Sequence, residues 1–236
     1  EGIYMFFDWT YVYFVLPAFI FALWASVNVN GTFKKYSKQF SSKGVSASEA
    51  ARRILDNKGL SDIRIERISG NLTDHYDPKA GVIRLSDSVY DSTSTAAIGV
   101  ACHEVGHAIQ YSENYVPIKI RNAIIPVTNI GSKLSIPLVL LGLFLSYLSE
   151  YMLVFAYVGI LCFALSTVFQ LVTLPTEYNA SGRALRAIDE YGILERDEMK
   201  GAKKVLSAAA MTYVAALAVS VMQLLRLLTI VNSRRR

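Results

Sequence analysis

The sequence predicts an α-helical multi-pass membrane protein with four transmembrane helices and a small α+β domain. First, 53% of its 236 residues are hydrophobic and the mean hydropathy is +0.33, which is more apolar than an ordinary soluble domain. Second, four apolar stretches are long enough to cross a hydrocarbon core of about 30 Å as helices. Third, 18% of the residues are charged, too many for membrane helices alone, so a modest water-exposed part is expected.

The first apolar stretch covers residues 3–29. Its single acid, Asp8, lies near the start, and tryptophan and tyrosine residues stand where interfacial aromatic side chains are expected. A cleaved signal peptide is the alternative, but the run exceeds the roughly 7–15 residues of a signal-peptide core and no basic segment precedes it. We therefore expect a retained transmembrane helix.

The remaining apolar stretches predict a helical hairpin and a final helix. Residues 132–174 hold two spans, separated by the polar pair Ser149 and Glu150. The last span covers residues 204–231, and its first half is rich in alanine and serine, which permits close helix packing. Arg226 near its end can extend toward a lipid headgroup.

The basic residues next to the spans predict orientation and partners. Four lysines and no acid follow the first span: Lys34, Lys35, Lys38 and Lys43. Since positive charge marks the cytoplasmic side, segments 30–131 and 175–203 are expected in the cytoplasm. The basic tail at 234–236 contradicts this, but such late charges usually weigh less. The net charge of +5 is therefore attributed to contact with the lipid bilayer and not to nucleic acid.

Segment 30–131 is expected to contain two helices and two strands. Its predicted elements are a helix at 46–59, a strand at 62–69, a turn at 71–81, an edge strand at 81–90 and a helix at 94–113. The first helix has Ser46 or Ser48 as its N-cap, with Glu49 three residues after Ser46, and ends at Gly59. The chain's two cysteines lie in a predicted helix and in an apolar span, so no disulfide framework is expected.

The helix at 94–113 contains the motif HEVGH, with His103 and His107 at its ends. Side chains four residues apart share one helix face, so both imidazoles can bind one zinc ion. Glu104 stands beside them, where a general base can meet a zinc-activated water, and Gly106 leaves room for a neighbouring element. The motif is short enough to arise by chance on a polar face. Two of the chain's three histidines lie in this helix, which is otherwise largely apolar, and this favours zinc binding over a chance match.

A catalytic zinc site needs a third protein ligand, and Glu177 is the best candidate. No histidine follows the motif at the HExxHxxGxxH spacing. Pro175 is expected to end the third span, so that Glu177 opens a cytoplasmic helix at the membrane surface. The alternative is a first-turn glutamate that merely favours the helix dipole.

Four further residues are candidates for oxyanion stabilisation or substrate binding. His75 and Tyr76 lie in a polar loop, and Arg183 and Arg186 lie on the helix predicted at 175–203. A loop-structuring hydrogen bond is the alternative for His75. Lipid contact or pairing with nearby acids is the alternative for the arginines. The strand at 81–90 could pair with an extended substrate or only support the motif helix.

Three stretches carry a resemblance to a known family: NLTDHYDPKAGVIRLSDSVYDSTSTAAIGVACHEVGHAIQY, LPTEYNASGRAL and ERDEMKGAKKVLSAAAMTYVAA. Together with the four spans they resemble the bacterial YugP-like neutral zinc metallopeptidases of the membrane. The resemblance implies a gluzincin-like, zincin-like α+β domain. His103, His107 and Glu177 would bind one catalytic zinc ion, and Glu104 would be the catalytic acid and base. Thermolysin-type gluzincins carry an aspartate four residues after the ligand glutamate; Ser181 stands here and could still hydrogen-bond a ligand.

We therefore expect a zinc-dependent endopeptidase in the bacterial cytoplasmic membrane, acting on peptide or membrane-protein substrates near the cytoplasmic surface. Zinc would lower the pKa of its bound water, and Glu104 would take the proton and pass it to the leaving amine. One alternative is a non-catalytic, zinc-stabilised membrane scaffold, which would have no need for Glu104. Another is an intramembrane protease, which would carry the motif inside a span.

Overall fold

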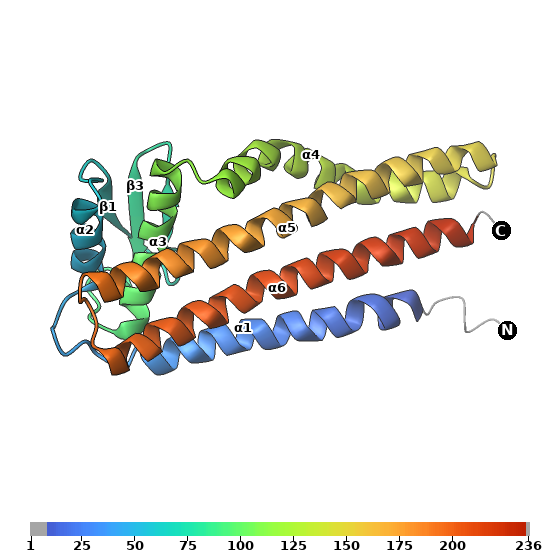
Figure 1. Ribbon diagram of the computed structural model, residues 1–236. Coiled ribbons are helices and arrows are strands. Elements are labelled where there is room, and N and C mark those ends of the chain that lie inside the picture. Colours follow the sequence, from blue (N-terminus) through green and yellow to red (C-terminus); the bar gives the residue numbers. More distant parts are fainter. Residues whose placement is uncertain (1–8, 235–236) are drawn as a thin grey trace. The chain divides into compact units, whose positions relative to one another are not determined.

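The computed structural model describes residues 9–234, so residues 3–8 of the first predicted span and the last two arginines lie outside the described part. Figure 1 shows the helices and strands of this range. In chain order they are α1 (Leu16–Tyr36), α2 (Ala47–Asn57), β1 (Arg64–Ile68), β2 (His75–Asp77), β3 (Val82–Ser86), α3 (Thr95–Ser112), α4 (Val116–Leu145), α5 (Leu153–Glu190) and α6 (Arg196–Ser233). The chain is therefore mainly helical, with one small sheet.

Four helical segments are long and apolar enough to cross a membrane. They are Tyr11–Tyr36, Val116–Leu145, Glu150–Glu190 and Arg196–Ser233. Their number agrees with the four spans predicted from the sequence. Each segment has at least 26 residues. About 20 helical residues are enough to span a bilayer, so every segment is long enough to do so.

Pro175 does not end a helix, contrary to expectation, and Glu177 does not begin a new one. Helix α5 continues through Pro175 to Glu190. Proline removes one intrahelical hydrogen bond but does not forbid a longer helix when packing stabilises the turns beyond it. Here those turns bury Ala184, Ala187 and Ile188 in an apolar core. Tertiary packing therefore outweighs the local stop signal.

The described chain separates into two compact units. One comprises Ser26–Ile118 together with Pro175–Met211, and the other comprises the rest. The core of the first unit draws on α2, β3, α3, α5 and α6 through Ile54, Leu55, Ile83, Leu85, Ile98, Val105, Ile188 and Leu206. The motif helix and the last turns of α5 therefore share one hydrophobic core.

Small residues allow close helix contacts in the other unit. The backbone of Gly142 in α4 lies against Ala156 in α5, where a side chain at position 142 would collide. Thr167 of α5 and Ser220 of α6 share a hydrogen bond of 2.8 Å. Close approach of small residues and hydroxyl hydrogen bonds are the usual means of packing between membrane helices.

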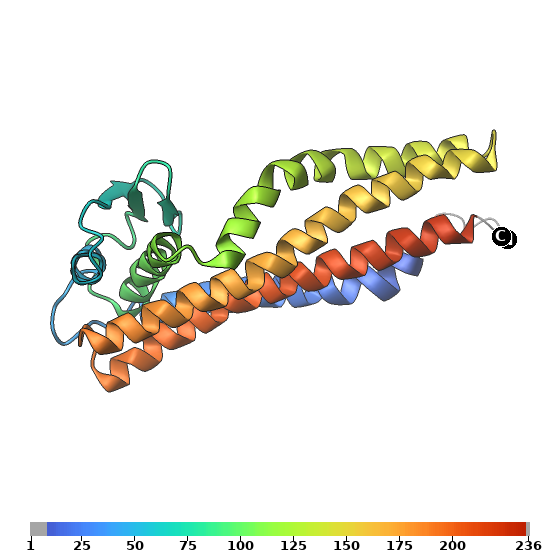
Figure 2. The ribbon, with the colours of Figure 1, turned by 45° about the horizontal axis from the view of Figure 1, so that its top comes forward.

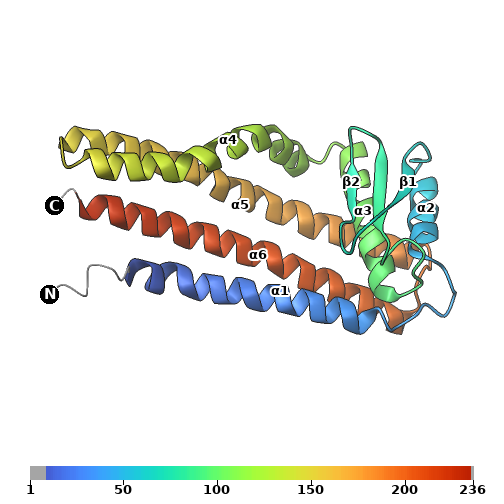
Figure 3. The same ribbon diagram turned by 180° about the vertical axis from the view of Figure 1, so that it is seen from behind.

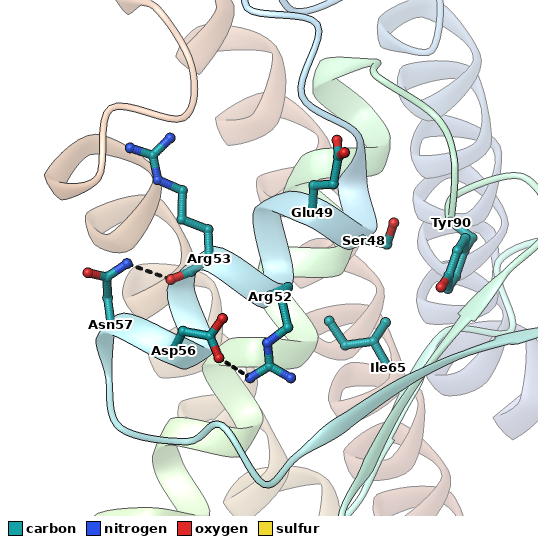
Figure 4. Close-up of a pocket in the computed structure, with 8 residues that line it drawn as sticks. All are labelled: Ser48, Glu49, Arg52, Arg53, Asp56, Asn57, Ile65 and Tyr90. Atoms are coloured by element: carbon teal, nitrogen blue, oxygen red, sulfur yellow. Dashed lines mark hydrogen bonds and ion pairs between the residues drawn. The ribbon is translucent and has the colours of Figure 1, made fainter.

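Helix α2 begins with the capping box that the sequence predicts. The Ser46 hydroxyl accepts from the Glu49 amide, and the Glu49 carboxylate accepts from the Ser46 amide at 2.8 Å. Its apolar face is buried. Its polar face borders a hollow of about 590 Å³, in which Arg52 pairs with Asp56 (Figure 4). No residue predicted for the catalytic site lines this hollow.

The sheet has the order β1-β3-β2, which corrects two expectations. β1 runs parallel and β2 antiparallel to β3 (Figure 3). The stretch 71–81, expected to be only a turn, contains β2. The strand expected at the sheet's edge, β3, is central. β2 was not predicted because it has only three residues, which lie among turn-forming residues and show no alternation of apolar and polar side chains. Ile83 and Leu85 are inaccessible to solvent on one face of β3, and Val82 and Ser86 are inaccessible on the other.

Helix α3 is almost wholly buried and approaches α5 closely (Figure 2). Its first turn is capped by the Ser94 hydroxyl, which accepts from the Ala97 amide. A Cβ at Gly106 would collide with the Ala180 carbonyl of α5. This contact confirms that Gly106 leaves room for another element. That element is the part of α5 that carries Glu177.

Candidate metal centre

Two imidazoles of α3 and one carboxylate of α5 converge in the first unit. The Nε2 atom of His103 lies 3.2 Å from Oε2 of Glu177, and the Nε2 atom of His107 lies 3.4 Å from the same oxygen. The two rings stand nearly perpendicular, with centroids 4.7 Å apart. One ligand atom from each residue lies within 4.8 Å of the others, so the group could hold a metal ion.

The distances from the two imidazole nitrogens to the Glu177 oxygen fit a shared zinc ion. Ligands about 2.0–2.1 Å from a tetrahedral zinc lie roughly 3.3–3.4 Å from one another. The measured contacts of 3.2 and 3.4 Å are close to this value. Two imidazole nitrogens and one carboxylate oxygen are also a donor set of catalytic zinc sites, which keep a fourth position open.

The Nδ1 atom of each imidazole has its own partner on the side away from Glu177. Nδ1 of His103 lies 3.1 Å from the Ser181 hydroxyl, and Nδ1 of His107 lies 3.0 Å from Oε1 of Gln110. Such partners orient a metal-binding histidine and select its tautomer. Ser181 was a candidate from the sequence. Gln110 was missed, although it stands one turn after His107 as a polar residue in an apolar helix.

The electrostatic surroundings of His107 favour positive charge. Burial by itself lowers its pKa, but the hydrogen bond to Glu177 and the charges of Glu104 and Glu177 outweigh this, so the pKa is raised above its usual 6.5. A metal cation would meet the same favourable field. Since a metal ligand must be neutral imidazole, binding would displace any proton held there.

Glu104 is a buried carboxylate beside the converging ligands. It is 8% exposed and close enough for its charge to act on His107. Among the described residues, no hydrogen bond or ion pair engages this carboxylate. A carboxylate without such partners can exchange a proton with a nearby water molecule, which is what a general base requires.

The structure does not bring His75 to the converging ligands. It is exposed on β2, where Nδ1 lies 2.9 Å from the Thr73 carbonyl and Nε2 lies 3.4 Å from Arg84. Tyr76 packs its ring edge-on against Tyr111 of α3, with centroids 5.5 Å apart, and burial raises its pKa. β2 therefore lies against the motif helix through Tyr76, while His75, its first residue, is bonded to the turn before the strand.

The structure does not bring the two arginine candidates into contact with the ligands either. Arg183 donates to Asn179 at 2.7 Å and forms an ion pair with Glu113 at 2.6 Å. Arg186 is exposed and borders a hollow of about 180 Å³ that Lys58 also lines. Sequence reasoning missed Asn179, whose position two residues after Glu177 carried no signal by itself.

Comparison with known proteins gives two matches and one negative result. The family model described as "Putative neutral zinc metallopeptidase" matches residues 11–232. The protein named "Putative membrane protease YugP" of Bacillus subtilis (strain 168) is 45% identical over 220 residues, which cover 93% of this chain and 96% of that protein. No solved structure matches the chain significantly.

Proposed function

Because the chain belongs to the neutral zinc metallopeptidase family, we propose that it is a membrane-embedded, zinc-dependent endopeptidase with a gluzincin-like site. The observation that carries the proposal is the convergence of His103, His107 and Glu177 at distances that suit one zinc ion. These three side chains would hold the ion. When bound, zinc supplies a Lewis acid that polarises a water molecule and the scissile carbonyl.

Glu104 is the general base in this proposal. Its carboxylate accepts a proton from the attacking water and later delivers it to the leaving amine. Support comes from its position next to His103, from its burial and from the lack of a competing partner among the described residues.

We propose that an extended substrate adds to the edge of the sheet at β2. β2 is paired with β3 on one side, and no strand of the described chain pairs with its other side. It packs against α3 through Tyr76 and Tyr111. Main-chain pairing there would run a peptide alongside the motif helix with little demand on its sequence. This role replaces the one expected for the strand at 81–90.

The proteolytic part comprises segments 30–131 and 175–203 and faces the cytoplasm close to the bilayer in this proposal. The four membrane-length helices and the match to a protein named a membrane protease support a membrane location. The lysines that follow the first span support the cytoplasmic side. A membrane surface beside the site favours peptides and membrane proteins as substrates.

Glu104→Gln tests the mechanism. The amide keeps the size of the side chain but cannot accept the proton, so casein cleavage should fall by about 100-fold or more while bound zinc is unchanged. Glu190→Gln, an exposed carboxylate at the end of α5, is the matched control and should cleave like wild type. Zinc content is measured by atomic absorption on the detergent-purified protein.

The scaffold alternative gives a different outcome in the same experiment. A non-catalytic, zinc-stabilised protein would bind zinc in both forms and cleave casein in neither. Wild-type cleavage by the Glu104→Gln variant would exclude Glu104 as the base. A wild-type protein without zinc would exclude the metal site itself.

A further inference from the structure

A chain of hydrogen bonds connects His107 to Arg183 through two amides. Nδ1 of His107 lies 3.0 Å from Oε1 of Gln110, and Nε2 of Gln110 lies 2.9 Å from Oδ1 of Asn179. The same Asn179 oxygen lies 2.7 Å from Nε of Arg183. The chain therefore crosses from α3 to α5 and starts at a proposed zinc ligand.

Arg183, together with the Thr176 carbonyl, sets the direction of the hydrogen bonds in this chain. A guanidinium group has donors and no acceptor. Asn179 must therefore present its oxygen to Arg183, and the same oxygen can only accept from Gln110. The amide nitrogen of Gln110 thus faces Asn179. Its second hydrogen is donated to the Thr176 carbonyl at 2.8 Å, so a reversed Gln110 amide would set its oxygen against two acceptors.

The same logic fixes the tautomer of His107. The Gln110 oxygen that faces Nδ1 can only accept, so Nδ1 carries the hydrogen. When a metal displaces the proton that Nε2 shares with Glu177, Nδ1 keeps the one ring hydrogen and the lone pair of Nε2 is free to bind. That lone-pair nitrogen is the one 3.4 Å from Glu177.

We propose that Arg183 is a positioning residue that holds His107 as its Nδ1–H tautomer, acting through Asn179 and Gln110, and so prepares Nε2 to bind the metal. The proposal rests on the proposed function in one respect, namely that Nε2 of His107 is a ligand. It also gives Arg183 a role other than the oxyanion or substrate contact expected from the sequence.

Burial makes the direction of these hydrogen bonds costly to reverse. Gln110 has no solvent exposure, so water cannot replace its partners if the amide turns over. The contact of Gly106 with the Ala180 carbonyl brings the two helices together one turn before Gln110. Unmatched donors or acceptors in a dry contact of this kind cost far more than at a surface.

A purely structural role for Arg183 is the competing explanation. Its ion pair with Glu113 and its position over the Tyr115 ring, 5.8 Å from the centroid, would tie α3 to α5 whatever the tautomer of His107. Glu113→Gln removes the ion pair but leaves the donation from Arg183 to Asn179. It is therefore the matched control.

Zinc affinity, measured by competition with a chelator, separates the two explanations. Arg183→Met should weaken zinc binding about tenfold, at the lower end of the range for partners of metal ligands. Arg183→Lys should retain affinity because an ammonium group also only donates, and Glu113→Gln should retain it too. Equal losses in Arg183→Met and Glu113→Gln, or no loss in Arg183→Met, would overturn the proposal.

A second pair of variants decides the matter if Arg183→Met does not fold. Asn179→Asp has only acceptor oxygens and preserves the direction of the chain, whereas Asn179→Leu interrupts it. The aspartate variant should bind zinc like wild type and the leucine variant about tenfold more weakly. Equal zinc affinity in the two variants would contradict the proposal.

Discussion

At the scale of single residues, the candidate metal centre depends on which atoms of His103, His107 and Glu177 face one another. Both imidazoles turn Nε2 toward Glu177, and both have an Nδ1 partner: Ser181 for His103 and Gln110 for His107. Partners of this kind restrict ring rotation and raise the basicity of the ligand nitrogen. In the proposed function, these contacts would hold the two Nε2 atoms in place for a metal ion.

Glu177→Ala should weaken zinc binding more than any change at a residue that only supports a ligand. Loss of a ligand removes a bond to the metal, so the affinity should fall beyond the roughly 10–100-fold range of supporting residues. Isothermal titration with zinc measures the change. The neighbouring exposed residue Tyr178, changed to phenylalanine, serves as control. Unchanged zinc affinity in Glu177→Ala would remove Glu177 from the ligand set.

At the scale of elements, the centre depends on the backbone contact of α3 with α5. Gly106 meets the carbonyl of Ala180, within one turn of His107 on one helix and of Glu177 on the other. A larger residue at position 106 would push the helices apart. The separation of the two helices therefore sets the distance between the imidazoles and the carboxylate.

Gly106→Ala should destabilise the protein although alanine is the better helix former. The added Cβ would collide with the Ala180 carbonyl, and overpacking of this kind costs about 1–3 kcal/mol. Gly182→Ala is the matched control, because a Cβ there meets nothing within 4 Å. It should instead stabilise α5 by about 0.5–1 kcal/mol. Thermal unfolding in detergent, followed by circular dichroism, compares the two variants. Equal shifts of Tm in the same direction would contradict this account.

At the scale of the whole molecule, the chain combines two kinds of packing. One unit has a core of large aliphatic residues around a sheet, as in water-soluble proteins. The other has exposed apolar helices with small residues and hydroxyl groups between them, as in membrane proteins. Helices α1, α5 and α6 run through both units, so the chain needs no separate linker between its apolar helices and the unit that carries the metal centre.

Cysteine labelling of intact cells should determine the orientation of the chain. In a protein without Cys102 and Cys162, we expect a membrane-impermeant maleimide to label Glu150→Cys from outside and Asp62→Cys only after permeabilisation. The expectation follows from the lysines after the first span, which favour the cytoplasm for the segment that contains Asp62. Labelling of Asp62→Cys in intact cells would place the metal centre outside.

The sequence by itself determined the features that depend on residues close together in the chain. Four apolar stretches predicted four membrane-length helices, the Ser46 and Glu49 pair predicted a capping box, and the spacing of His103 and His107 placed both imidazoles on one helix face. Each of these features follows from local geometry, which is the same in every helix.

Only the tertiary structure decided the features that depend on distant residues. It carries α5 through Pro175, puts β3 in the centre of the sheet and connects Arg183 to His107 through Asn179 and Gln110. A helix stop, a strand order or a buried amide network is settled by the free energy of packing segments many residues apart. His103 and Glu177, 74 residues apart, meet because α3 and α5 pack backbone to backbone, and no local pattern states that distance.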